Sequence, residues 1–185
     1  MLIFRALSRQ GAAPERLIFV CVMTEIVVSS LEAAATAYER CKPGFVASIC
    51  DHDDCVPEAF KGLPEGRHLK LDPAASEIDM APAVIAFAKA WAATEENALV
   101  HCHRGVARST AIAYIMMCVR EPDMCEEKIA ARLRAAAPHA DPNLLLVSEA
   151  DRLLGREDRM VGAILDLCPC CGAVCTSIVT LPVGP

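Results

Sequence analysis

Short apolar runs alternate along this chain with longer stretches that repeat apolar residues at helical spacing. Runs rich in branched and aromatic residues, typical of buried strands, occur at 17–23, 45–50, 67–71 and 98–101. Strands that alternate with helices favour a parallel sheet with helices on both of its faces. The pattern therefore predicts an α/β fold with a central, mostly parallel sheet.

Helical periodicity fills much of the remaining chain. The segment 81–94 places Val84, Phe87, Ala88 and Trp91 on one apolar face and Pro82 in its first turn. The segment 109–120 is apolar almost all round, which predicts the central buried helix of the domain. Further helices are expected from 30 to 40, from 123, from 142 to 154 and from 160 to 167.

Short polar residues indicate where several of these helices begin. Ser29 or Ser30 precedes the segment that ends at Arg40 and is expected to cap it. Asp123 and Glu126 have the spacing of a capping box, and Asp141 stands before Pro142 as the cap of the next helix.

The loop 101–109, HCHRGVARS, carries the strongest chemical signal in the chain. Gly105 tolerates positive φ, which lets the loop curl until the N–H groups of residues 103–108 surround a dianion. The helix that follows adds its positive dipole end, and Arg108 offers a planar fork for two phosphate oxygens. Over this positive well, Cys102 is expected to be a thiolate at neutral pH. The loop therefore indicates phosphate chemistry.

The pattern H-C-x5-R-S in this loop resembles the signature of the cysteine-based protein tyrosine and dual-specificity phosphatases. The resemblance implies that Cys102 attacks phosphorus to form a phosphocysteine and that Arg108 holds the phosphate oxygens. It also implies that Ser109 stabilises the thiolate and that His101 supports the loop from behind. The loop residues between them would bind substrate: His103, Arg104, Gly105, Val106 and Ala107.

Hydrolysis through a phosphocysteine also needs a proton donor for the leaving oxygen. In the phosphatases that this chain resembles, an Asp on a mobile loop, after a strand and about thirty residues before the cysteine, supplies the proton. Asp72 follows the predicted strand 67–71 at that distance from Cys102. Asp79 and Glu77 are alternatives, and no aromatic residue stands beside Asp72. We therefore predict Asp72 as the general acid.

Composition and charge restrict the partners and the cellular location that we expect for this protein. The chain has 185 residues and a net charge of −6, which argues against nucleic acid as its main partner. No uninterrupted apolar run approaches the length of a membrane span, and no secretory signal is recognisable. The eleven cysteines then favour reduced thiols and a cytoplasmic location.

The sequence predicts three parts in this chain. Residues 1–16 form an extension or an extra edge strand, 17–167 the phosphatase-like domain, and 168–185 a cysteine-rich tail. The runs PHADPN and ADRLLGREDRM resemble a bacterial group of predicted tyrosine phosphatases, and this likeness covers roughly 17–167. The tail departs from it. Cys168, Cys170, Cys171 and Cys175 have the spacing of a zinc knuckle, but no second knuckle accompanies them, and a flexible end is favoured over a zinc site. The loop 50–55 is likewise favoured as a solvated turn over a metal site.

Three functions stay open at this point. The first is a protein tyrosine or dual-specificity phosphatase that needs no metal or cofactor and acts on a phosphorylated protein or a small phosphomonoester. The second is an inositol phosphate or phosphoinositide phosphatase of the same fold, because His103 and Arg104 add positive charge to the loop. The third is a phosphate-binding module with weak or no turnover. The sequence leaves the oligomeric state undetermined.

Overall fold

A five-stranded sheet forms the centre of the protein in the computed structural model, which describes residues 23–50, 56–167 and 178–184. The strand order is β3-β2-β4-β1-β5; β1 through β4 are parallel, and β5 runs antiparallel to β1. The strands are β1 (Thr24–Ser30), β2 (Phe45–Ile49), β3 (His68–Leu71), β4 (Ala98–Cys102) and β5 (Ile178–Val183). The predicted mostly parallel sheet is therefore confirmed.

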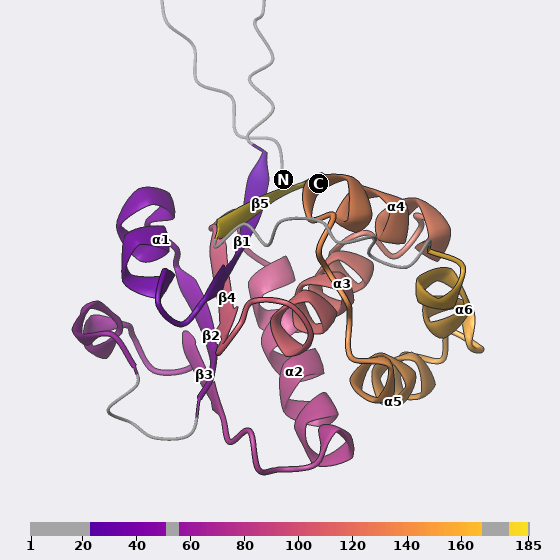
Figure 1. The fold of residues 1–185 in the computed structure, drawn as a ribbon, viewed down its shortest axis with the longest axis horizontal. Helices are drawn as coiled ribbons and strands as arrows, with labels where there is room; N and C mark the ends of the chain where they lie inside the picture. Colours follow the sequence, from indigo (N-terminus) through magenta and orange to yellow (C-terminus); the bar gives the residue numbers. More distant parts are fainter. Residues whose placement is uncertain (1–22, 51–55, 168–177, 185) are drawn as a thin grey trace, which may run out of the picture.

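Helices cover both faces of the sheet, as the alternating pattern predicted. α1 (Ala34–Cys41) lies on one side, and the five later helices lie on the other (Figure 1). The later helices are α2 (Glu77–Ala92), α3 (Arg108–Arg120), α4 (Glu126–Ala136), α5 (Leu144–Leu154) and α6 (Arg159–Leu165), and a short 3-10 helix, η2 (Glu58–Gly62), precedes β3. No helix of these described stretches has the length and apolar character that crossing a membrane requires.

The larger core lies between the sheet and α2–α6. α3 is buried from Ser109 to Cys118 and is the central helix that its all-round apolar sequence predicted. Val84, Phe87, Ala88 and Trp91 of α2 are all buried, so the predicted apolar face is confirmed. Trp91 packs as a core residue and donates its indole N–H to the Glu96 carbonyl at 2.7 Å. These contacts fix α3, and hence the loop before it, against the sheet.

The first strand lies later in the sequence than expected. Residues 17–22 lie outside the described part of the chain, and Met23 is half exposed and precedes the strand. β1 is instead Thr24–Ser30, whose Glu25 and serines obscure an apolar centre of Ile26, Val27 and Val28. Ser29 therefore lies inside the strand, one residue before its end, and does not cap a helix. Ser30 Oγ accepts a hydrogen bond from Ala33 N at 3.3 Å in the turn before α1.

Three other helix starts differ from the sequence prediction. α2 begins at Glu77, four residues early, because Ser76 Oγ accepts the Asp79 N–H and caps it; Pro82 consequently lies inside the helix. α4 begins at Glu126 with Cys125 as its N-cap residue, so the predicted capping box is wrong. α5 is capped by Asn143, whose Oδ1 accepts the Leu146 N–H at 3.0 Å.

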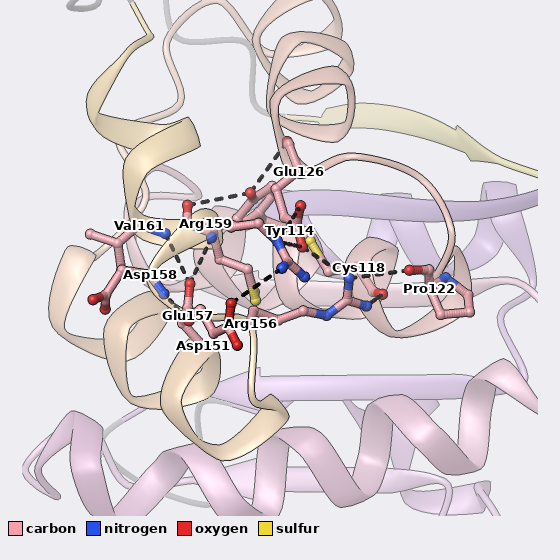
Figure 2. A network of polar contacts seen from close by, with 11 residues as sticks. Tyr114, Cys118, Pro122, Glu126, Asp151, Arg156, Glu157, Asp158, Arg159 and Val161 are labelled. Carbon is pink, nitrogen blue, oxygen red and sulfur yellow. Dashed lines mark hydrogen bonds and ion pairs between the residues drawn. The ribbon is translucent and has the colours of Figure 1, made fainter.

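A buried polar cluster joins α3, α4, α5 and α6 away from the loop 101–109 (Figure 2). Glu126, 3% exposed, accepts hydrogen bonds from Arg156 Nη1 at 2.9 Å and Arg159 Nε at 3.3 Å. Asp151, 1% exposed, accepts the N–H groups of Asp158 and Met160 at the start of α6. The cluster satisfies the charges that it buries, which indicates a structural role.

Candidate active site

The loop that carries the signature residues joins β4 to α3 at the carboxyl end of the parallel strands. β4 lies between β1 and β2, and Cys102 is its last residue. Leu31 N, just beyond β1, donates to the His103 carbonyl at 3.3 Å. Clefts at the carboxyl ends of parallel strands are the usual ligand sites of α/β sheets.

The Cys102 sulfur lies at the base of this loop, in a side chain that is only 7% exposed. Its Sγ lies 3.1 Å from Ser109 Oγ and accepts the Gly105 N–H at 3.2 Å. The structure thus brings Cys102 and Ser109 together, as the resemblance to the phosphatase signature implied.

Gly105 occupies a position that only glycine suits. Its φ is +72°, in the left-handed region. A Cβ placed there would lie 2.9 Å from Ser29 C and Ser30 N, both backbone atoms of β1. The loop can therefore curl against β1 only because residue 105 lacks a side chain.

Arg108 is the first residue of α3, and its guanidinium is held by Glu77 at the start of α2. Glu77 Oε1 accepts hydrogen bonds from Arg108 Nε at 3.3 Å, Arg108 Nη2 at 3.2 Å and Asn143 Nδ2 at 3.1 Å. Its own backbone amide, together with Arg108 and Asn143, holds the pKa of Glu77 below its ordinary value. A carboxylate kept ionised in this way orients Arg108 and is poorly suited to donate a proton, which argues against Glu77 as the general acid.

The two candidate aspartates lie in different surroundings. Asp72 follows β3 and is exposed; its Oδ1 accepts the Ala74 N–H at 2.8 Å, and the next residue, Pro73, lines the pocket described below. Asp79 lies on α2, where Oδ2 accepts the Ser76 hydroxyl at 2.6 Å. Asp72 thus belongs to the segment that reaches the pocket, whereas Asp79 is engaged at a helix start.

His101 lies within the sheet, on β4 directly before Cys102. Its ring is fully buried, and Nε2 lies 2.6 Å from Ser48 Oγ on β2, which in turn lies 2.8 Å from His68 Nε2 on β3. Burial and the neighbouring His68 lower the pKa of His101 to about 4. The imidazole is therefore neutral at physiological pH, and its hydrogen bond joins β4 to β2.

A pocket of about 540 Å³ opens above Cys102. His103, Arg104, Val106, Ala107 and Arg108 line it from the loop; Leu31, Ile49, Cys50, Pro73, Asp141 and Asn143 line it from other segments. Gly105 packs against β1 and is not among these residues. Sequence reasoning missed Asp141 and Asn143 because it assigned the segment 138–143 only as a loop before a helix.

The described ranges contain no candidate metal site, because no group of three or more His, Cys, Asp or Glu side chains there lies close enough to share an ion. Cys168, Cys170, Cys171 and Cys175, and residues 51–55 of the second candidate metal site, lie outside those ranges. Among the residues that line the pocket are a cysteine, Cys102, and two arginines, Arg104 and Arg108.

Comparisons with known proteins identify the fold. No protein-family model matches the sequence, and no curated protein matches it. Human DUSP28 is similar in structure, with a TM-score of 0.53 and 19% identity over 72% of this chain and 90% of that one. Cydia pomonella PTP-2 phosphatase has a TM-score of 0.54 and 19% identity, over 71% of this chain and 86% of that one. The Yvh1 phosphatase domain from Chaetomium thermophilum has a TM-score of 0.52 and 19% identity, over 73% of this chain and 93% of that one. The chain therefore has the α/β fold of the dual-specificity and protein tyrosine phosphatases.

Proposed function

We propose that this protein is a phosphomonoester hydrolase that acts through a phosphocysteine on Cys102, with a phosphorylated protein as its substrate. The observation that carries the proposal is the position of the Cys102 sulfur. It lies at the base of a pocket and is hydrogen-bonded to Ser109 Oγ and Gly105 N, and Arg108 also lines this pocket. In this proposal Cys102 is the nucleophile, Arg108 binds the phosphate and Ser109 stabilises the leaving thiolate.

The reaction has two steps. The Cys102 thiolate attacks phosphorus, the bond from phosphorus to the substrate oxygen breaks, and Asp72 protonates that oxygen as it leaves. Water then attacks the phosphocysteine, and Asp72 takes a proton from this water. Inorganic phosphate leaves as the thiolate re-forms, and the thiolate accepts a hydrogen bond from the Ser109 hydroxyl. Neither step requires a metal or another cofactor. Arg108, oriented by Glu77, holds the phosphate oxygens throughout.

Hydrolysis of para-nitrophenyl phosphate in the presence of a chelator tests the mechanism. We expect Cys102→Ser to abolish turnover while still binding inorganic phosphate. Asp72→Asn should slow hydrolysis of alkyl phosphates, which are poor leaving groups, far more than that of para-nitrophenyl phosphate. The matched control is Asp79→Asn, which should change neither rate; the reverse pattern would move the general acid to Asp79. Equally negligible turnover by wild type and Cys102→Ser would support the phosphate-binding module instead.

A second candidate substrate is an inositol phosphate or phosphoinositide. It is favoured by His103 and Arg104, both exposed and both lining the pocket above Cys102. A multiply phosphorylated ring would use this extra positive charge, whereas a single phosphate on a protein would not. Arg104→Ala should therefore lower kcat/KM about tenfold on inositol phosphates if they are substrates, with little change on a phosphotyrosine peptide.

A further inference from the structure

Asn143 contacts the signature loop and the first turn of α2 at the same time. Its backbone N–H donates to the Ala107 carbonyl at 3.3 Å, and its Nδ2 donates to Glu77 Oε1 at 3.1 Å. Its remaining side-chain atom, Oδ1, accepts the Leu146 N–H at 3.0 Å and caps α5, which lies beside α2 (Figure 1). Asn143 also lines the pocket above Cys102. Because the cap fixes one side of the amide group, the orientation of the other side is fixed as well.

Glu77 Oε1 links the Asn143 amide to Arg108. The same oxygen accepts hydrogen bonds from Arg108 Nε at 3.3 Å and from Arg108 Nη2 at 3.2 Å. A guanidinium is a planar fork with five N–H groups, so the edge bound by Glu77 determines where the opposite edge points. The Nη1 side of Arg108 is therefore directed away from the carboxylate, and its direction depends on the position of Oε1.

The pair of Glu77 and Arg108 is accessible to water. The Glu77 side chain is 16% exposed and the Arg108 side chain 31%. Ion pairs that water reaches are weak, and both side chains lose rotational freedom when they are held in one geometry. The Asn143 amide adds a second donor to the same oxygen, and this donor is already ordered by the cap of α5.

The two contacts of Asn143 with this region differ in how much depends on them. The Ala107 carbonyl that accepts the backbone N–H of Asn143 also accepts Ala111 N at 3.0 Å and the Thr110 hydroxyl at 3.0 Å. The start of α3 thus has further support. The guanidinium of Arg108 is instead oriented by one carboxylate oxygen, so the side-chain contact of Asn143 is the one that matters for Arg108.

We propose that Asn143 is a positioning residue for phosphate binding: its Nδ2 holds the Glu77 carboxylate where that carboxylate directs the Arg108 guanidinium toward the pocket. The inference rests on the proposed function for its catalytic meaning, but the guanidinium can also be observed without turnover. In the absence of the amide, the carboxylate can follow the guanidinium into solvent. A bound phosphoryl group would then lose part of its two-pronged contact with Arg108.

The substitution Asn143→Ser isolates the amide. Serine caps helices about as well as asparagine, so the cap of α5 and the backbone N–H remain, but its short side chain cannot reach Glu77. We expect binding of inorganic phosphate, measured by calorimetry, to weaken about fivefold, as the loss of one ordinary hydrogen bond predicts. kcat/KM for para-nitrophenyl phosphate should fall by a similar factor. In NMR spectra, the Arg108 Nε–H signal should exchange faster with water than in the wild type.

A double-mutant cycle tests whether Asn143 acts through Glu77. In a Glu77→Ala background, Asn143→Ser should change phosphate affinity by less than about twofold, because the acceptor of the amide is already absent. The matched control is Asn97→Ser, before the other end of β4, where the Asn97 side chain donates to the Cys41 carbonyl and accepts the Glu25 N–H. This control should lower the melting temperature without changing phosphate affinity.

Unchanged phosphate affinity and an unchanged Arg108 Nε–H signal in Asn143→Ser would overturn the proposal. An equal loss of affinity with and without Glu77 would overturn it too, because Asn143 would then act by another route. If Asn143→Ser does not fold, the isosteric Asn143→Asp replaces it, since it keeps the cap and cannot donate to Glu77. Absence of turnover or of phosphate binding in the wild type would count against the proposed function only, because the Arg108 signal would still report on Asn143.

Discussion

Replacing Gly105 by alanine is the most direct test of how the loop is built. The substitution adds one methyl group at a residue with φ of +72°, where the new Cβ would meet backbone atoms of Ser29 and Ser30 at 2.9 Å. Ordinary contacts at such a carbon begin near 3.4 Å, so β1 and the loop must separate by about 0.5 Å. Neither partner is a flexible side chain that can rotate away.

The magnitude follows from two separable costs. A left-handed φ costs a residue with a side chain about 1–2 kcal/mol, of which about half is offset because alanine also restricts the unfolded chain. The steric overlap adds about 1–3 kcal/mol, as overpacking does in cores. We therefore expect Gly105→Ala to lower the free energy of unfolding by about 2–4 kcal/mol. A displacement of this size at the phosphate cradle should lower kcat/KM by about 30- to 100-fold.

The chain supplies matched controls for the first cost alone. Gly66 and Gly155 also have positive φ, +77° and +65°, but a Cβ at either would have no atom within 4 Å. Their alanine variants should lose at most about 1 kcal/mol and keep full activity. Urea unfolding followed by circular dichroism, together with para-nitrophenyl phosphate kinetics, measures both quantities. A Gly105→Ala variant as stable and active as Gly155→Ala would show that the contact with β1 does not constrain the loop.

Two further predictions concern buried charge and acid stability. Glu126→Gln should lower the free energy of unfolding by about 3 kcal/mol, because it leaves Arg156 without its anion. The control Glu149→Gln, which removes the anion of the pair with Arg152, should leave urea unfolding nearly unchanged. Equal effects of the two substitutions would exclude a buried network. The pKa of His101 is lowered to about 4, so its neutral form stabilises the fold above pH 6.5 and this stabilisation is lost as pH falls from 6.5 toward 4, by roughly 3 kcal/mol in total. His101→Gln should flatten that part of the pH dependence of unfolding, and an unchanged slope would contradict the assignment.

The central layers of the fold could be predicted from the sequence because each carries a strong local pattern. β2, β4 and α3 are nearly continuous apolar segments, and their periodicity alone gives their places. β5 was missed although Val179, Leu181 and Val183 alternate as buried residues. Pro182 obscured it, because proline argues against a strand unless that strand lies at the edge of a sheet, as β5 does.

The candidate site also has one part that could be predicted from the sequence and another that could not. Cys102 and Ser109 belong to one short motif, and the resemblance of that motif to the phosphatase signature implied the contact that the structure shows. The partner of Arg108 is Glu77, 31 residues away, and periodicity gives no means of pairing the two. Sequence reasoning considered Glu77 as an acid because it could see the residue type but not the guanidinium beside it.

The Val106 and Ala107 carbonyls, which accept hydrogen bonds from the segment 141–143, show why such a loop cannot be understood from its motif alone. The residues 101–109 provide the sulfur, the arginine and a glycine that can curl, but a glycine that can curl one way can also rotate back. The hydrogen bonds from Asp141 N to the Val106 carbonyl and from Asn143 N to the Ala107 carbonyl select one of these conformations from outside the loop. A cradle of amides that is already oriented before phosphate binds does not have to reorganise as charge develops during the reaction. The chemistry of the loop therefore depends on a segment more than thirty residues further along the chain, and substitutions there should alter catalysis without touching any residue of the motif.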